Sequence, residues 1–249
     1  IVDYYVWAYR PSYPDPDGFW QMSPGRDNNY VRFGENFFYS SQLDSLSGDF
    51  VGGELSIGRA TYYSIKNGDY NDPNTWSKLG FEYTGNPSNT APNKRSDRVM
   101  IRDTVTISAP IAKTNIVWVD KGVVNTVTKT GRLRILGSNI IQGDTMRVGS
   151  NVAAENAGIL DIGHPNGIVL ASTKLDSGAV QTNVRDFSMN GIYRFIDSTA
   201  ALQTTGDAVP SPVRSIAIEG GSITDTVALS KTLIISDSLV VNQGALDIG

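Results

Sequence analysis

The chain has 249 residues, 40% of them hydrophobic, and a formal net charge of −4. This length is enough for one large all-β domain or two smaller domains with real cores. The net charge argues against a broad nucleic-acid interface, which needs clustered Lys and Arg, and no apolar run approaches the roughly 20 residues that cross a bilayer. The chain has no Cys, which excludes disulfides and thiolate metal sites.

The first 60 residues are rich in aromatic side chains and turn formers. Of the 23 Phe, Trp and Tyr residues in the chain, 19 occur by Tyr83. In segments such as DYYVWAYR and NYVRFG, bulky apolar and polar residues alternate, and clusters of Pro, Gly, Asp and Asn separate the segments. Residues 1–60 are therefore predicted to form a small aromatic-rich β module, the end of a preceding domain. Because alternation is already running at Ile1 and is unfinished at Gly249, we expect a processed piece of a longer protein.

Residues 61–96 contain the segment YYSIKNGDYNDPNTWS, which concentrates turn formers around one Trp. The first coil of a stacked β protein exposes an apolar end that must be covered, and Tyr70 and Trp76 are large enough to cover it. Asn71 and Asp72 can accept backbone donors, and Pro73 fixes one dihedral of the turn. We predict a cap and first loop here, with Trp76 buried. The alternative is that Trp76 stacks on carbohydrate.

Residues 97–249 consist of short β-branched segments punctuated by Gly, Asn, Asp and Ser, without a sustained helical period. We predict a parallel β-solenoid with less than about 10% helix; an ordinary sandwich is the alternative. The segment GILDIG at 158–163 returns as GALDIG at 244–249, which suggests four coils of about 20 to 22 residues. Strand alternation then places two pairs of residues in the core and one pair outside. The core residues are Leu160, Ile162, Leu246 and Ile248, and the outward residues are Asp161 and Asp247.

The segment YYSIKNGDYNDPNTWS, followed by GNPSNTAPNKRSDRVMIRDTVTIS, resembles a stretch of large secreted and surface proteins of the Bacteroidetes. In those proteins such a stretch opens a right-handed parallel β-helix, and the proteins are exported by type IX secretion. The resemblance covers residues 62 to about 108. Tyr70 stands where the family pattern often has Trp, and Asp103 where a His is frequent. The resemblance implies an extracellular or cell-surface location.

Candidate catalytic and metal-binding residues are few. The one His in the chain, His164, is predicted to lie in a turn between coils, and no nucleophile motif accompanies it. Asp15 and Asp17 resemble a fragment of a calcium loop, but Arg26 stands where the loop needs Glu, so an ordinary turn is favoured. We assign no catalytic, cofactor-binding or metal-binding residue and predict no cofactor.

Two further groups of charged residues were considered as sites. Solenoid lyases and hydrolases need carboxylates stacked on one flank, and the conceivable contributors are Asp161, Asp186, Asp197 and Asp247. Isolated Asp residues more often satisfy backbone groups at corners. The densest basic group is predicted to be a solvated loop leading into a strand, and it contains Lys94, Arg95, Arg98 and Arg102.

The leading functional hypothesis is a non-catalytic structural or adhesive segment of a large secreted or cell-surface protein. The expected partners are the type IX secretion machinery, outer-membrane surface components and glycans, with no nucleic acid and no membrane span in this segment. The alternative is a polysaccharide lyase or hydrolase of β-helix architecture. A third hypothesis is a passenger whose specific partner is the export machinery.

Overall fold

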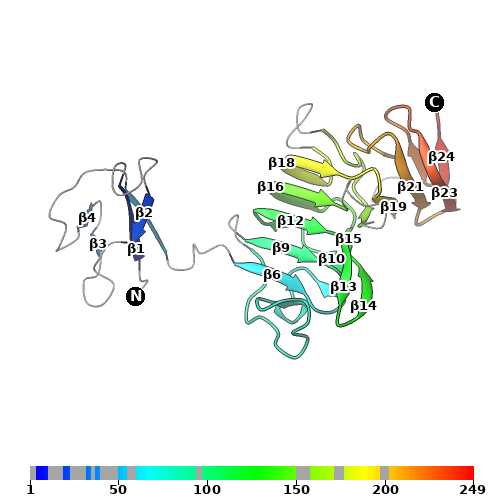
Figure 1. Cartoon of the computed structure of the whole chain (residues 1–249). Helices are drawn as coiled ribbons and strands as arrows, with labels where there is room; N and C mark the ends of the chain where they lie inside the picture. The colour runs from blue at the N-terminus through cyan, green and yellow to red at the C-terminus, as the bar shows by residue number, and fades with distance from the viewer. Residues whose placement is uncertain are drawn as a thin grey trace. The chain divides into compact units, whose positions relative to one another are not determined.

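The computed structural model describes residues 60–93, 97–149, 158–170, 177–196 and 202–249 with their side chains, and the backbone of five short strands before residue 60. The chain divides into two compact units, residues 1–59 and 60–249. The described residues form strands and one short 3-10 turn, with no α-helix, which confirms the predicted all-β class (Figure 1). None of them forms a helix long and apolar enough to cross a membrane.

The first unit contains two small antiparallel sheets. In one of them β1 (Tyr4–Arg10) lies between β2 (Phe19–Met22) and β5 (Phe50–Glu54). In the other, β3 (Arg32–Gly34) pairs with β4 (Phe37–Tyr39). The alternating aromatic segments of the sequence therefore do form strands, separated by the turn-rich segments.

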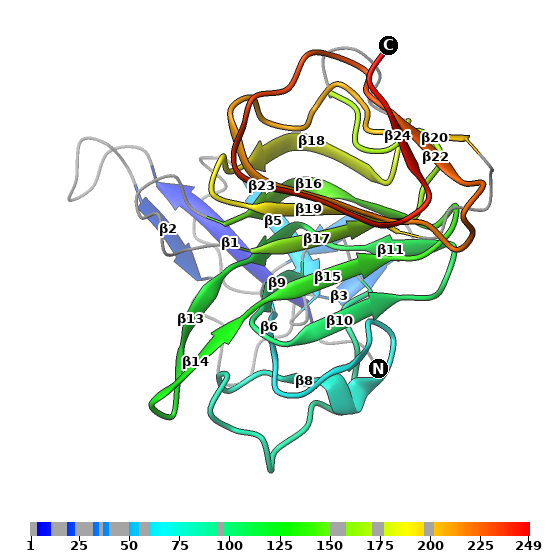
Figure 2. The ribbon, with the colours of Figure 1, turned by 90° about the vertical axis from the view of Figure 1, so that its right-hand side faces the viewer.

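The second unit contains a seven-stranded sheet that we call the β17 sheet, with the order β23-β21-β19-β17-β15-β10-β7. All its neighbouring strands are parallel. Figure 2 shows β10, β15, β17 and β19 side by side. The strands are β7 (Gly68–Asp69), β10 (Thr104–Ile107), β15 (Arg132–Ile135), β17 (Ile159–Ile162), β19 (Ile192–Ile196), β21 (Val213–Glu219) and β23 (Ile235–Gln243).

A second sheet, which we call the β12 sheet, has the order β11-β16-β12-β9-β6-β8, and β18 also pairs with β16. Its pairs are parallel except β6 with β8, which close the end of the stack. In Figure 1 β6, β9, β12, β16 and β18 follow one another up the unit. The strands are β6 (Thr61–Ser64), β8 (Trp76–Ser77), β9 (Arg98–Ile101), β11 (Ile111–Lys113), β12 (Ile116–Val119), β16 (Ile140–Val148) and β18 (Val180–Phe187).

Two smaller sheets complete the unit. β20 (Leu202–Thr204), β22 (Thr226–Ala228) and β24 (Ala245–Asp247) form a parallel sheet, the β22 sheet. β13 (Lys121–Val124) and β14 (Val127–Thr130) form an antiparallel hairpin. Apart from this hairpin, every pair of described strands after residue 97 is parallel, which confirms the predicted parallel pairing.

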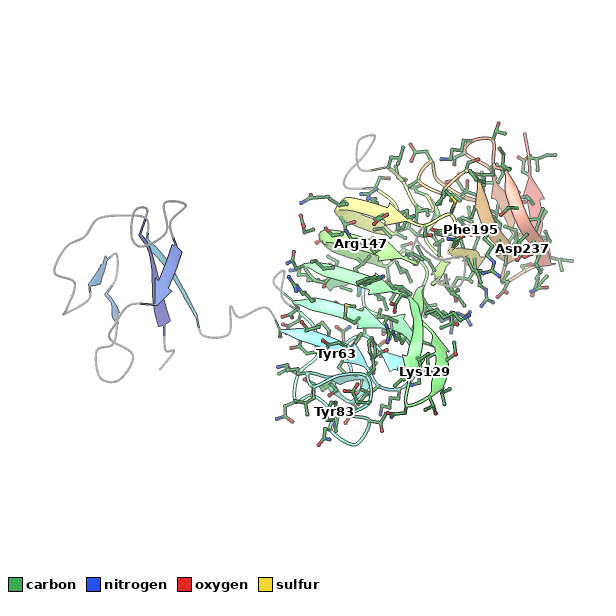
Figure 3. The ribbon with its side chains drawn as sticks, in the orientation of Figure 1. Tyr63, Tyr83, Lys129, Arg147, Phe195 and Asp237 are labelled. Carbon is green, nitrogen blue, oxygen red and sulfur yellow. The ribbon has the colours of Figure 1, made fainter. Side chains whose placement is uncertain are left out.

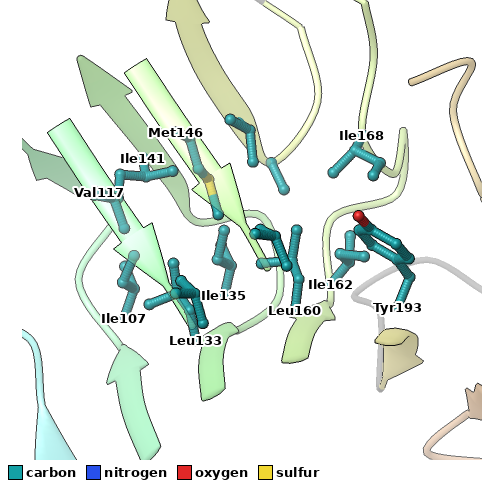
Figure 4. Close-up of a cluster of buried hydrophobic side chains, with 14 of the residues drawn as sticks. Ile107, Val117, Leu133, Ile135, Ile141, Met146, Leu160, Ile162, Ile168 and Tyr193 are labelled. Carbon is teal, nitrogen blue, oxygen red and sulfur yellow. The ribbon is translucent and has the colours of Figure 1, made fainter. Parts of the chain in front are cut away.

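Apolar side chains from the β17 and β12 sheets meet to form the core (Figure 4). In the β17 sheet the inward residues lie directly opposite one another on successive strands, so that each column buries a continuous row of apolar side chains. One column contains Val105, Leu133, Leu160, Tyr193, Ile216 and Leu239. These residues are 28, 27, 33, 23 and 23 positions apart, as their residue numbers give, so the coils are unequal and longer than predicted.

The predicted equivalence of GILDIG and GALDIG is wrong. Leu160 and Ile162 are fully buried, as expected, but they lie in the β17 sheet, whereas Leu246 lies in the β22 sheet. Leu246 is partly buried against the core, and Ile248 is 76% exposed, contrary to prediction. The two segments share a strand alternation and flanking Gly residues, and both features are common to many strands, so their similarity did not indicate equivalent positions.

The outward direction predicted for the two Asp residues holds for only one of them as exposure. Asp247 is exposed. Asp161 is on the strand face opposite Leu160 and Ile162, as alternation requires, yet its side chain has no exposed surface. The reason is that arginine side chains from neighbouring strands cover it.

Candidate functional site

The cap residues Trp76 and Tyr70 are completely buried. The indole Nε1 of Trp76 donates to the backbone oxygen of Tyr70 at 2.9 Å, and the two rings meet edge to face with centroids 5.6 Å apart. The hydroxyl of Tyr70 donates to the backbone oxygen of Lys113 at 3.0 Å, and burial raises the pKa of Tyr70 far above its ordinary value. Both rings belong to the same core cluster as Val99 and Val105.

The turn between these two aromatics is held by short side chains. The Oδ1 of Asp72 accepts the backbone N–H of Asn74 at 2.9 Å and caps the 3-10 turn η2 (Pro73–Thr75). Pro73 occupies the start of that turn, where its missing N–H costs nothing. The predicted role of Asn71 is different: its own backbone N–H donates to Asp69 Oδ1 at 2.8 Å. The local chemistry therefore folds the chain back so that Trp76 enters the core.

The burial of Trp76 decides between its two predicted roles. Carbohydrate stacking needs an open aromatic face, and the Trp76 side chain exposes none. The prediction of a buried cap residue is confirmed, and stacking of Trp76 on sugar is contradicted.

The outer face of the β17 sheet carries a cluster of ions around Asp161, which we call the Asp161 cluster. Arg132 donates from Nε to Asp161 Oδ2 at 2.7 Å. Arg134 Nε lies 3.2 Å from the same oxygen, and Arg194 Nε lies 3.8 Å from Oδ1. Arg194 also pairs through Nη2 with Glu219. Three guanidinium groups from two flanking strands thus surround one carboxylate.

Strand alternation and parallel register bring the Asp161 cluster together. Arg134, Asp161 and Arg194 are direct neighbours on β15, β17 and β19, and Arg132 is two residues before Arg134 on the same face. The Asp161 side chain is wholly covered, whereas the arginine side chains are 25%, 38% and 19% exposed for Arg132, Arg134 and Arg194. Neither Asp161 Oδ1 nor Arg134 Nε has a hydrogen-bond partner. The arginines therefore hold the carboxylate largely by charge.

The outer face of the β12 sheet is different in character. One in-register row combines aromatic, thioether and charged side chains: Tyr63, Met100, Trp118, Arg147 and Asp186. Arg147 and Asp186 form an ion pair at 3.2 Å and are each 49% exposed. Tyr63 and Arg147 are labelled in Figure 3. The buried Trp118 Nε1 and Arg98 Nε have no hydrogen-bond partner, so this face carries donors without acceptors.

The four Asp residues considered for solenoid catalysis do not form one site. Asp161 lies in the β17 sheet, Asp186 in the β12 sheet and Asp247 in the β22 sheet. Asp197 lies outside the described residues, as do Asp15 and Asp17 of the calcium-loop hypothesis. Within the part of the chain that the structure describes, no three His, Asp or Glu side chains are grouped as a metal site requires.

The predicted basic loop is described only in part. Lys94 and Arg95 lie outside the described residues. Arg98 begins β9, and Arg102, just after that strand, pairs with Asp120 at 3.1 Å. The guanidinium carbon of Arg102 also lies 4.4 Å from the centroid of the Phe81 ring. Arg102 therefore stabilises the junction between cap and stack.

His164 lies in a turn after β17, as predicted. Its Nδ1 accepts the backbone N–H of Asn166 at 3.1 Å, and its backbone oxygen accepts from Gly167 and from the side chain of Gln203. Partial burial lowers the pKa of His164 below the ordinary 6.5. These contacts give the imidazole a structural role in the turn.

Acidification is expected to destabilise the fold partly through His164. The unfolded chain binds the imidazole proton at higher pH than the folded chain, so this contribution to stability is present above the ordinary pKa of 6.5 and is lost as pH falls through the lower folded pKa. Protonation of Nδ1 also removes the hydrogen bond from Asn166. Urea unfolding at about pH 7.5 and pH 5 should show a larger loss of stability in the wild type than in His164→Gln. Equal losses in the two proteins would exclude this role.

Sequence reasoning missed the three arginines of the Asp161 cluster. The alternation in RLRI does place Arg132 and Arg134 on one outward face, and that was the available signal. The carboxylate that they share is on another strand, and its register is not encoded locally.

The chain was compared with known proteins. No family model, no curated protein and no solved structure matches it.

Proposed function

We propose that residues 60–249 are part of a right-handed parallel β-helix that serves as a non-catalytic structural or adhesive segment of a large secreted or cell-surface protein. The observation that carries this proposal is the in-register stacking of parallel strands. Along the chain, β9, β10, β12, β15, β16, β17, β18 and β19 alternate between the β12 and β17 sheets. Parallel crossovers of this kind are almost always right-handed.

The arrangement of charged residues supports a binding role over a catalytic one. A general acid or base needs a carboxyl group that can exchange protons with a substrate. Asp161, the most buried carboxylate of the lyase hypothesis, is instead enclosed by three guanidinium groups. The two outer faces offer extended rows of polar, charged and aromatic side chains, which suit attachment to an elongated ligand.

A glycan array probed with the 249-residue chain tests this proposal. We expect binding to one or more polysaccharides, with no new reducing ends and no unsaturated uronate products after prolonged incubation with the bound polysaccharides. Release of such products would support the lyase or hydrolase alternative. Absence of binding to every glycan would reject the adhesive role.

Type IX export and a surface location form part of the proposal and rest on the resemblance of residues 62 to 108. Antibodies against this segment are expected to label intact cells that produce the parent protein. Labelling should be lost in a strain without the type IX translocon. Labelling that persists in that strain would reject this export route.

A further inference from the structure

We propose that Arg132, Arg134 and Arg194, on the outer face of the β17 sheet, bind the acidic groups of a polysaccharide. The ligand groups are carboxylates or sulfate esters, because both present the planar or forked oxygens that guanidinium recognises in bidentate fashion. This inference rests on the proposed adhesive function and assigns it a place and a ligand chemistry.

The arginines are held in place but are not saturated. Asp161 draws all three guanidinium groups together from β15 and β19. Among the described residues, neither Nη of Arg134 makes a hydrogen bond, and Nη1 of Arg132 and of Arg194 makes none. Each side chain is partly exposed. The cluster therefore presents N–H donors to solvent in positions fixed before a ligand arrives, which lowers the entropy cost of binding.

The charge of the cluster favours an anion. Arg132, Arg134 and Arg194 carry three positive charges, whereas Asp161 and Glu219 carry two negative charges, which leaves one positive charge. An acidic group placed over the exposed guanidinium groups neutralises that excess and supplies acceptors for the free N–H groups.

The layout of the arginines favours a linear polysaccharide. Arg134 and Arg194 are in register with Asp161 on the strand between them, so their strands are about 9.5 Å apart, which is two strand spacings. This distance is close to the disaccharide repeat of extended acidic polysaccharides, so a chain lying across the strands could place successive acidic groups at both arginines.

Nucleic acid is a poorer match for the same surface. The phosphate backbone carries charges at close, regular intervals and needs an extended basic footprint. The net charge of this chain is −4, and the Asp161 cluster has only one excess positive charge. Isolated acidic groups at wide spacing fit it better.

The test compares the 249-residue wild type with Arg134→Gln and with the double variant Arg134→Gln/Arg194→Gln. Arg134 donates no hydrogen bond from its guanidinium to the described residues, so its substitution should leave folding intact. Arg147→Gln is the matched control, because Arg147 is a half-exposed arginine paired with one Asp on the β12 sheet. Circular dichroism and thermal unfolding verify the fold of each variant.

The probes separate the two acidic groups. Polygalacturonate carries carboxylates only, chondroitin sulfate carries carboxylates and sulfate esters, dextran sulfate carries sulfate esters only, and dextran is neutral. Duplex DNA tests for general attraction to polyanions. Kd values are measured by isothermal titration at low and at physiological salt.

We expect binding to at least one acidic polysaccharide, with little binding to dextran or DNA. Arg134→Gln should weaken that binding about ten-fold, as expected for loss of one charge-assisted contact, and the double variant should weaken it further, while Arg147→Gln stays within about two-fold of the wild type. Dextran sulfate and polygalacturonate report which acidic group is recognised.

Three outcomes would overturn the proposal. They are unchanged binding of acidic polysaccharides by the double variant, equal loss in Arg147→Gln, and equal affinity for DNA. If acidic polysaccharides do not bind but other glycans on the array do, the Asp161 cluster is not the site and the adhesive function stands. If no glycan binds, both proposals fail.

Discussion

Replacement of Trp76 by Ala is expected to lower the free energy of unfolding by about 3–5 kcal/mol, the usual cost of truncating a buried large aromatic. The Trp76 side chain is completely buried, contacts Tyr70 and Tyr62 edge to face, and donates its Nε1–H inside the core. The truncation leaves a cavity and removes the donor to the Tyr70 backbone oxygen. Urea unfolding followed by far-ultraviolet circular dichroism measures the change.

Tyr83→Ala is the control for Trp76→Ala. Tyr83 follows the same cap segment but is 41% exposed, so its truncation should change stability by less than about 1 kcal/mol. A Trp76→Ala chain that unfolds at the same urea concentration as the wild type would reject the capping role and would reopen the search for a ligand at this residue.

The strands, their parallel pairing and the buried cap could be predicted because each depends on a local pattern. Alternation of apolar and polar residues gives the two faces of a strand, which is why Leu160 and Ile162 were placed correctly. Turn formers between two large aromatics gave the position of the cap, and the contacts of Asp72 with Asn74 explain it.

The repeat length could not be predicted because successive coils differ in length. Steps of 28, 27, 33, 23 and 23 residues separate the members of the Val105 to Leu239 column. A two-strand hairpin, β13 and β14, is inserted between β12 and β15. A repeat inferred from six matching letters therefore assigned Leu246 and Ile248 to the wrong sheet.

The Asp161 cluster escaped prediction for the same reason. Alternation marked Asp161 as outward, and an isolated outward Asp is ordinarily exposed. Its burial depends on Arg132 and Arg134 from the preceding coil and Arg194 from the following coil. Only the register of three strands, far apart in the sequence, shows that they meet.

Asp161→Asn is expected to destabilise the second unit by about 3 kcal/mol, the lower end of the cost of removing one partner from a buried ion pair. The amide keeps the volume of the side chain, so no cavity forms, but three guanidinium groups then lie close together without their shared carboxylate. The cost is at the low end because the arginine heads are partly exposed and can turn toward water. Urea unfolding measures it.

Salt and two further variants separate this charge effect from a general disturbance of the strand. Added salt screens the repulsion among the partly exposed arginines, so the destabilisation by Asp161→Asn should shrink at high ionic strength. The additional substitution Arg134→Gln should recover part of the loss, because it removes one of the unneutralised charges. Asp186→Asn, which breaks an exposed single pair with Arg147, should cost less than about 1 kcal/mol. An Asp161→Asn protein as stable as the wild type would mean that the three arginines find water as readily as they find the carboxylate, and the Asp161 cluster would then not hold them in place for a ligand.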